Sequence, residues 1–376
     1  MRHRPRRARA AGPALAAVLA LLALTGCTGG TAGEGQPAGT AGSPTPAAVE
    51  SESAPSEEPP EESSRAAPDP RTLRGPATAD QIPEIEPVAS PTPELPVTTV
   101  GVDGVEVTVT DTSRLLALDL YGTLVETVIG LGLGERLVGR SVSNTEASVA
   151  DLPVVTQNGH ELSAEAILGL DPTAVVMDTT MGPPEIPDQL RSAGVPVLVV
   201  SPERGVDLIA EQIRHVAGAL GVAEAGETLV DQFEGDLGEA ETYVAELAGE
   251  WDPLRMAFLY VRGTGSVFFV MGDGSGGDDL IEHIGGLDAA TDAGISDIVP
   301  ATAEAVIALD PEVILTMTGG LESTGGLDGL LERPGIAQSV AGEQERVIDM
   351  ADGDVLSFGP SFPAVLTALA DAVYQP

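Results

Sequence analysis

The chain has 376 residues, of which 58 are acidic and 18 basic, and its formal net charge at neutral pH is −40. Every basic residue is an arginine. Because so acidic a chain repels nucleic acid, nucleic-acid binding is excluded. The single cysteine, Cys27, excludes intrachain disulfides, so stability has to come from a hydrophobic core.

The first 27 residues are typical of an exported lipoprotein. Five arginines precede an apolar run, Ala14 to Leu24, which is long enough for a signal peptide and short for a membrane span. The run ends in LTGC, so a small residue stands directly before Cys27, as in the lipobox of bacterial lipoproteins. We expect residues 1–27 to be a signal peptide and acylated Cys27 to anchor the protein to the extracellular face of the cell membrane.

Residues 28–112 are rich in Gly, Ala, Pro, Ser, Thr and Glu, a composition that buries too little apolar surface to order itself. We predict that this segment is a disordered linker that lifts the folded part off the membrane. Only its last portion, VEVTVTDT, alternates like a strand that could pair with the folded part.

From Ser113 onward, strand and helix patterns alternate, which is typical of an α/β fold with parallel sheets. We expect two similar Rossmann-like lobes, residues 113–224 and 252–376, with a ligand cleft between them. Residues 225–251 are predicted to form one long rigid helix as the sole connection, separated by a weak break near Gly226 from the helix before it.

A repeated segment supports the two-lobe interpretation. SAEAILGLDPTAVVM, from Ser163 to Met177, recurs as TAEAVIALDPEVILT from Thr302 to Thr316, 139 positions later. Each copy predicts a Ser- or Thr-capped helix that Asp-Pro ends before a buried strand. Two such units in one chain indicate two lobes built alike, and such proteins usually bind their ligand between the lobes.

Three residues could carry ligand chemistry. His160 follows the loop TQNG in a polar context, whereas His3 falls in the signal peptide and His215 and His283 in apolar helices that favour structural roles. Tyr260 and Arg262 are two apart on a strand and so share a face, where a guanidinium stabilises a phenolate. Imidazole and tyrosinate suit ferric haem, although a core tyrosine with a solvated arginine explains the second pair equally well.

The segments LDLYGTLVETVIGLGLGERLVGR, LPVVTQNGHELSAEAIL and FLYVRG resemble the haemin-binding lipoproteins of actinobacterial ABC importers, HmuT-like members of the class that binds siderophores, cobalamin and haem. The resemblance covers residues 113–374. It implies that His160 and Tyr260 are axial ligands of the haem iron and that Arg262 supports Tyr260. It further implies that Met317 and Tyr121 contact the haem.

The same resemblance implies partners. Relatives dock on the permease of the importer through one glutamate per lobe, and the matching residues are Glu165 and Glu304. The expected function is non-enzymatic capture and delivery of haem. One departure concerns the loop GISDIVP, which lacks a tyrosine that relatives often have there, so packing on one porphyrin face is expected to differ.

Two other interpretations remain. A related binder with a ferric-siderophore or cobalamin ligand would have the same architecture. The segment LALDLYGTL also resembles the first motif of haloacid-dehalogenase-like hydrolases, with Asp119 as nucleophile, but the lysine that family uses is absent from the chain. The glycine-rich VMGDGSGGDDLI is crowded by acidic residues and lacks a phosphate-binding spacing, so we interpret it as a cleft loop.

Overall fold

The computed structural model describes residues 69–265 and 267–375, within the unit Ala67–Pro376. The predicted signal peptide, Cys27 and the first part of the predicted linker lie outside the described residues. Among the residues that are described, no helix combines the length and the apolar character needed to cross a membrane.

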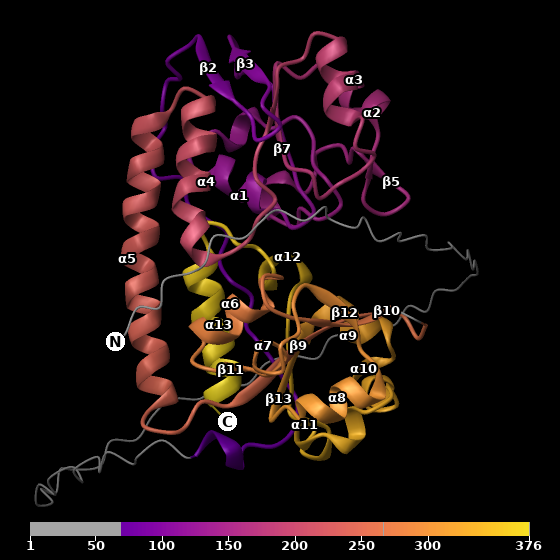
Figure 1. Cartoon of the computed structure of the whole chain (residues 1–376). Helices are drawn as coiled ribbons and strands as arrows, with labels where there is room; N and C mark the ends of the chain where they lie inside the picture. Colours follow the sequence, from indigo (N-terminus) through magenta and orange to yellow (C-terminus); the bar gives the residue numbers. More distant parts are fainter. Residues whose placement is uncertain (1–68, 266, 376) are drawn as a thin grey trace, which may run out of the picture. The chain divides into compact units, whose positions relative to one another are not determined.

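The N-terminal lobe, in which Figure 1 labels the helices α1 to α4, is built on a three-stranded parallel sheet in the order β4-β7-β8. Its strands are β4 (Leu115–Leu118), β7 (Ala174–Met177) and β8 (Val197–Val199), and every residue in them is buried. Burial on both faces explains their unbroken apolar sequences. The lobe also contains α1 (Thr123–Gly130), the hairpin β5 (Thr156–Gln157) and β6 (Glu161–Leu162), α2 (Ala164–Gly169), α3 (Ile186–Ser192) and α4 (Val206–Ala219).

The C-terminal lobe contains a seven-stranded mixed sheet in the order β1-β14-β13-β9-β10-β12, with β11 also paired to β9. Its strands are β1 (Ala77–Thr78), β9 (Arg255–Arg262), β10 (Val267–Met271), β11 (Leu287–Asp288), β12 (Ile298–Pro300), β13 (Val313–Met317) and β14 (Val347–Met350). Its helices are α6 (Gly277–His283), α7 (Ala289–Asp292), α8 (Ala303–Leu309), α9 (Thr318–Ser323), α10 (Gly326–Leu331), α11 (Val340–Glu343), α12 (Asp352–Val355) and α13 (Phe362–Tyr374). The predicted α/β class with two lobes is confirmed, but the two sheets differ more than the repeat indicated.

A helix of 26 residues, α5 (Ala223–Ala248), joins the lobes. It packs against α4 of the N-terminal lobe and α13 of the C-terminal lobe, so it runs along both (Figure 1). The predicted break near Gly226 is wrong, because the break falls at residues 220–222 and Gly226 lies in the first turn of α5. A side chain at Gly226 would meet Cβ of Ala217 at 2.5 Å, so this glycine allows α4 and α5 to approach closely.

The predicted linker is ordered in its last part, so the prediction of disorder is wrong for residues 69–112. Strand β1 pairs in parallel with β14 of the C-terminal lobe, and β2 (Val97–Val100) pairs with β3 (Glu106–Val109). The turn between β2 and β3 contacts the N-terminal lobe, where the Val102 amide donates to the Val199 carbonyl. The chain therefore enters the C-terminal lobe first and then crosses to the N-terminal lobe.

This crossing segment, residues 80–95, is a second connection between the lobes, so the prediction of α5 as the sole connection is also wrong. Its apolar side chains Ile82, Ile85 and Val88 pack against the core. Its backbone is held by the Val88 amide bonding to Gly130 and the Glu94 amide bonding to Gly221. Prolines restrict its conformation before folding, which lowers the entropy cost of fixing it there.

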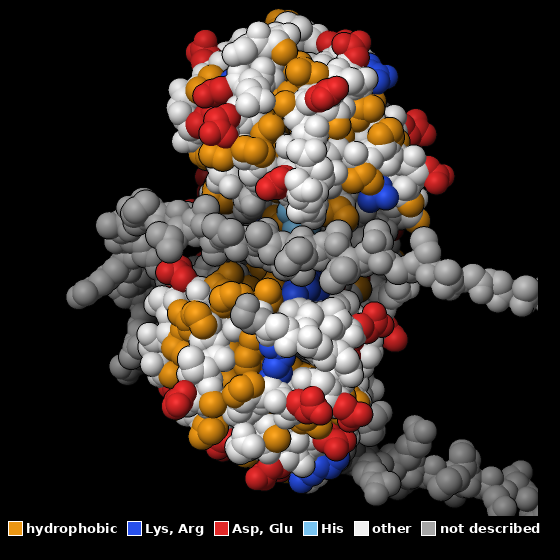
Figure 2. Space-filling view, turned by 90° about the vertical axis from the view of Figure 1, so that its right-hand side faces the viewer, with side chains coloured by type: hydrophobic (Ala, Val, Ile, Leu, Met, Phe, Trp, Pro, Cys, Tyr) orange, Lys and Arg blue, Asp and Glu red, His pale blue; other side chains and the backbone are white. Residues whose placement is uncertain are grey.

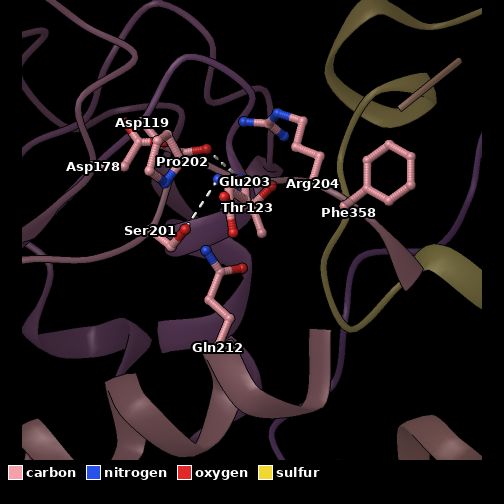
Figure 3. Close-up of a pocket in the computed structure, with 9 residues that line it drawn as sticks. All are labelled: Asp119, Thr123, Asp178, Ser201, Pro202, Glu203, Arg204, Gln212 and Phe358. Carbon is pink, nitrogen blue, oxygen red and sulfur yellow. Dashed lines mark hydrogen bonds between the residues drawn. The ribbon is translucent and has the colours of Figure 1, made fainter. Parts of the chain in front are cut away.

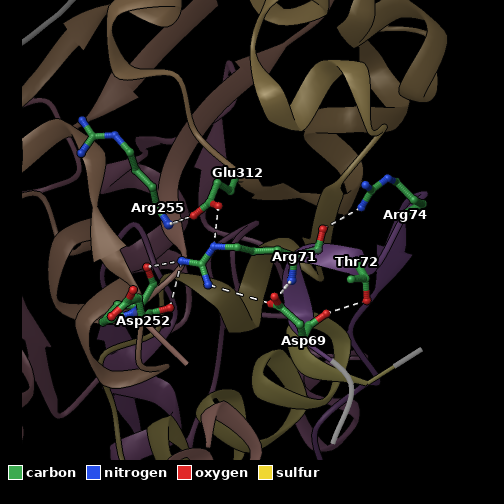
Figure 4. A network of polar contacts seen from close by, with 8 residues as sticks. Asp69, Arg71, Thr72, Arg74, Asp252, Arg255 and Glu312 are labelled. Atoms are coloured by element: carbon green, nitrogen blue, oxygen red, sulfur yellow. Dashed lines mark hydrogen bonds and ion pairs between the residues drawn. The ribbon is translucent and has the colours of Figure 1, made fainter. Parts of the chain in front are cut away.

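Arg71 fastens the start of the described chain to the C-terminal lobe (Figure 4). Its Nε donates to Glu312 at 2.8 Å, and its Nη2 donates to the carbonyls of Asp252 and Pro253 at 3.0 and 3.1 Å. The other carboxylate oxygen of Glu312 accepts from the Arg255 amide at the start of β9. The segment that leads toward the predicted anchor therefore leaves the fold at the amino ends of β9 and β13.

The lobes also contact each other directly through a set of hydrogen bonds, the polar seam, which involves Glu126, Arg204, Leu356, Ser357 and Ser361. Buried Glu126 of α1 accepts from the Ser357 hydroxyl at 2.7 Å and from the Ser361 amide. Arg204 donates to the Leu356 carbonyl at 3.2 Å. Since these bonds join groups from different lobes, a large rotation of one lobe away from the other would break them. The seam and the two connections restrict such motion.

Candidate functional site

The residues predicted to bind a ligand lie on elements that face the boundary between the lobes. Tyr260 and Arg262 stand at the carboxyl end of β9, and Met317 ends the neighbouring strand β13. His160 lies in the turn between β5 and β6 of the other lobe. Carboxyl ends of parallel strands are the usual ligand-binding edge of an α/β sheet.

The C-terminal lobe brings Tyr260, Arg262 and Met317 together. The guanidinium of Arg262 lies 5.5 Å from the centre of the Tyr260 ring, as their shared face on β9 predicts. Its Nη2 lies 3.8 Å from the sulfur of Met317 and 2.6 Å from a carboxylate oxygen of Asp352. Tyr260 and Arg262 are both only partly buried. Met317 is 2% exposed, so this cluster offers a phenol oxygen and a cation to a ligand at the boundary, while the thioether is buried against the guanidinium.

His160 offers a neutral imidazole from the N-terminal lobe. Partial desolvation lowers its pKa, and the positive charge of Arg262 lowers it further. The charge of Arg262 acts on His160 across the boundary, because the two side chains belong to different lobes. The Ser143 hydroxyl is 3.4 Å from Nδ1, a contact that leaves Nε2 free to bind a metal. The imidazole keeps its lone pair at neutral pH.

One face of the Tyr121 ring is covered by the guanidinium of Arg204. The guanidinium of Arg204 lies 3.2 Å from the centre of the Tyr121 ring, in a cation–π contact. Since Arg204 also bonds to Leu356 of the other lobe, the pair lies at the interlobe seam. Sequence reasoning missed Arg204, although its place three residues after the predicted strand VPVLVVS was a usable signal.

A small polar cavity lies at the carboxyl ends of β4, β7 and β8 (Figure 3). Its volume is about 10 Å³, room for about one water molecule, so it is not a site for a large ligand. Asp119, Asp178 and Arg204 line it, together with Phe358 from the C-terminal lobe. Burial raises the pKa of Asp178 to about 7, and the negative charge of Asp119 contributes to this rise.

Asp119 has a structural role in this arrangement. Its carboxylate accepts from the backbone amides of Tyr121, Thr123 and Leu124 at 3.0 to 3.2 Å, and so caps the start of α1. Asp119 is 2% exposed, and burial raises its pKa while Arg204 opposes that rise. A buried carboxylate engaged by three amides is poorly placed to attack a substrate, so the geometry does not favour the hydrolase interpretation.

The repeat folds in both lobes as its sequence predicts. Ser163 Oγ accepts from the Ala166 amide and Thr302 Oγ1 from the Ala305 amide, each at 3.2 Å, which caps α2 and α8. Glu165 and Glu304 occupy the first turn of these helices and are exposed.

An exposed apolar side chain lies three residues after each of these glutamates: Leu168 is 37% exposed and Ile307 is 49% exposed. Leu168 and Ile307 are themselves 139 positions apart and therefore equivalent in the repeat. Residues three apart on a helix share a face. Each lobe thus presents a carboxylate and an apolar group together.

The remaining histidine with described contacts is structural. His283 Nδ1 lies 2.8 Å from the Asp279 carbonyl one turn earlier, and the ring meets Phe362 edge-on at 6.2 Å. Acidic side chains are scattered over both lobes on the face that Figure 2 shows. This distribution agrees with the exclusion of nucleic acid as a partner.

The chain is similar to known binding proteins. The sequence model of the family described as periplasmic binding protein matches residues 120–352. An uncharacterized ABC transporter substrate-binding lipoprotein of Bacillus subtilis, YvrC, is 23% identical over 260 residues, which cover 68% of this chain and 79% of that protein.

Solved structures give closer matches. The crystal structure of heme binding protein HmuT is 48% identical, covers 82% of this chain and 100% of that chain, and has a TM-score of 0.79. The periplasmic heme-binding protein RhuT from Roseiflexus sp. RS-1 is 38% identical, covers 70% and 99%, and has a TM-score of 0.65. Matched structures also include HmuT variants in which a histidine, a tyrosine and an arginine two positions after that tyrosine are replaced by alanine.

Proposed function

The chain belongs to the periplasmic binding protein family, and we propose that it captures ferric haem between its lobes and delivers it to an ABC importer. The observation that carries this proposal is the cluster of Tyr260, Arg262 and Met317 on one lobe, with His160 within electrostatic reach on the other. A similar protein of 48% identity is described as heme binding, and its variants replace a tyrosine and an arginine with the same spacing as Tyr260 and Arg262.

The side chains have complementary roles toward ferric haem. A tyrosinate is a hard, anionic ligand that suits Fe(III), and a neutral imidazole can occupy the opposite axial position. Arg262 places a positive charge 5.5 Å from the centre of the Tyr260 ring, and Met317, which is 2% exposed, packs its sulfur 3.8 Å from that guanidinium. Tyr121, beneath Arg204, supplies aromatic surface at the edge of the cleft. No bond of the cargo is made or broken, so the protein acts as a receptor and not as an enzyme.

The proposed location is the extracellular face of the cell membrane. It rests on the lipobox-like sequence around Cys27 and on the similarity to a substrate-binding lipoprotein. The acyl chains on Cys27 would hold the protein at the membrane, and the segment before Asp69 would be the tether. Fastened by Arg71, that tether leaves the C-terminal lobe at the strand ends opposite the proposed haem site.

Titration of the purified protein with haemin tests the proposal. A saturable one-to-one change in the Soret band, together with a phenolate-to-iron charge-transfer band, is the expected result. The competing outcome, a siderophore or cobalamin receptor, is detected in parallel by quenching of Trp251 and tyrosine emission with a ferric siderophore or cobalamin. A protein that leaves the haemin spectrum unchanged would exclude haem as the cargo.

Docking on the importer is a second prediction. We propose that Glu165 and Glu304 pair with arginines of the permease and that Leu168 and Ile307 fill apolar sockets beside them. Replacing both glutamates with arginine is expected to leave haemin titration unchanged and to lower importer-dependent haem uptake by cells at least about tenfold, since like charges then face each other.

The matched control replaces two exposed glutamates of α5, Glu234 and Glu246, with arginine. That variant has the same change in net charge and is expected to support normal uptake. Equal uptake by the two double variants would show that the glutamates of α2 and α8 serve only to stabilise the first turns of their helices.

A further inference from the structure

Arg262, which lies over the Tyr260 ring, also forms an ion pair with the carboxylate of Asp352. Asp352, at the start of α12, accepts from Arg262 Nη2 at 2.6 Å through one oxygen and from the Gly319 amide at 2.8 Å through the other. The two side chains are 28% and 35% exposed, so the ion pair is partly shielded from water. Each oxygen of Asp352 thus has a fixed partner, and its carboxylate cannot turn without losing one of them.

The backbone around this ion pair leaves room for it only because two residues lack side chains. A Cβ at Gly319 would lie 2.9 Å from a carboxylate oxygen of Asp352. A Cβ at Gly320 would lie 3.0 Å from Arg262 Nη1 and 2.7 Å from the Val261 carbonyl. All three distances are shorter than ordinary contacts to a methyl group. The backbone at the start of α9, where the sequence is Thr-Gly-Gly, therefore packs directly against the ion pair.

The position of the guanidinium follows from these contacts. Three elements meet at it: β9 supplies Arg262, β14 leads into Asp352, and β13 brings the sulfur of Met317 to 3.8 Å. A free arginine side chain has many rotamers, whereas this one is fixed between a carboxylate, a thioether and the face of Tyr260. Partners behind the residue that supports a ligand commonly set its geometry.

We propose that Asp352 is a positioning residue of the haem site, which holds the Arg262 guanidinium over the Tyr260 ring while the Gly319–Gly320 backbone confines the pair. This inference rests on the function proposed above. Asp352 touches no cargo itself. Without it, Arg262 is free to turn toward solvent, and the negative oxygen of Tyr260 loses a fixed cation.

A double-mutant cycle tests the proposal. Asp352→Ala is expected to weaken haemin binding about tenfold and to shift the phenolate-to-iron charge-transfer band. Asp352→Asn keeps an acceptor oxygen of the same shape and is expected to recover part of the loss. In an Arg262→Ala background, Asp352→Ala is expected to change neither affinity nor the band further, because Asp352 acts only through Arg262.

Asp349→Asn is the matched control. Asp349 is 4% exposed and bonds to Thr318 and Thr78, so its loss disturbs the same region of the sheet without touching Arg262. In the Asp349→Asn variant, the phenolate-to-iron charge-transfer band is expected to stay at its wild-type position. The inference is overturned if Asp352→Ala has no effect, or has the same effect in the Arg262→Ala background. A wild type that does not bind haemin removes the proposed function, and the inference with it.

Discussion

Replacing Tyr260 with phenylalanine is expected to abolish the phenolate-to-iron charge-transfer band and to weaken haemin binding at least about 100-fold. The phenylalanine ring fills the same space on β9, so the lobe keeps its packing and only the oxygen is lost. Loss of a residue behind a metal ligand already costs about 10- to 100-fold in affinity, and loss of the ligand itself removes a bond to the metal. Absorbance titration of the two proteins measures both effects.

Tyr243→Phe is the control for this experiment. Tyr243 bonds to Asp371 at 2.6 Å on the surface where α5 meets α13, away from the strand ends. It is expected to bind haemin as the wild type does. His160→Ala is expected to retain the charge-transfer band with a changed Soret maximum, since the imidazole comes from the opposite lobe. If Tyr260→Phe kept both the band and the affinity, Tyr260 would be a core residue and not an iron ligand.

The two-lobe fold could be predicted because its signals are local. A capping Ser or Thr, an acidic first turn and an Asp-Pro stop define each copy of the repeat, and buried strands of aliphatic residues follow. The contact between Tyr260 and Arg262 could be predicted for the same reason, since residues two apart on a strand share a face. Both predictions depend on spacing along one element and not on how elements meet.

The ordered structure of residues 69–112, the last part of the predicted linker, could not be predicted in the same way. Its proline-rich sequence forms only short strands, and its partners, such as Glu312 for Arg71 and Gly130 for Val88, are distant in sequence. Composition therefore indicates disorder, whereas contacts that only the folded lobes provide make the segment ordered. Propensity is overridden by tertiary structure here.

Asp352 was missed for a different reason. It is one of 58 acidic residues, so its chemistry alone gives no signal. Its position after the strand RVIDM does place it at the ligand-binding edge, but its partner Arg262 lies 90 residues earlier. Only the parallel pairing of β13 with both β9 and β14 brings the two together.

The strand registers also show how the two lobes diverged. Asp119 and Asp178 directly follow the paired strands β4 and β7, whereas Tyr260 and Met317 lie at the ends of the paired strands β9 and β13, and Asp178 corresponds to Met317 in the repeat. One lobe therefore places a phenol and a thioether where the other buries two carboxyl groups beside Arg204. The ligand proposed for the N-terminal lobe, His160, therefore lies in the turn between β5 and β6 and not at a strand end.

Those buried carboxyl groups lead to the second large prediction, that the ligand-free protein is more stable at about pH 5 than at about pH 8. Burial raises the pKa of Asp178 to about 7 and that of Glu146 to about 7. In the unfolded chain both titrate near about pH 4. Between these values the native state holds protons that the unfolded state has lost, so the free energy of unfolding falls as the pH rises.

Urea unfolding at the two pH values measures the effect, which from Asp178 alone is on the order of 3 kcal/mol. Asp178→Asn replaces one of the two titrating groups with a neutral one of the same shape and is expected to remove its contribution while leaving that of Glu146, whereas Asp151→Asn, at an exposed position, is expected to remove neither. Repulsion within a chain of net charge −40 also grows with pH, but added salt screens exposed charges. A dependence that persists in about 0.5 M salt and becomes smaller with Asp178→Asn therefore comes from the buried carboxyl groups, whereas one that salt removes would come from the surface.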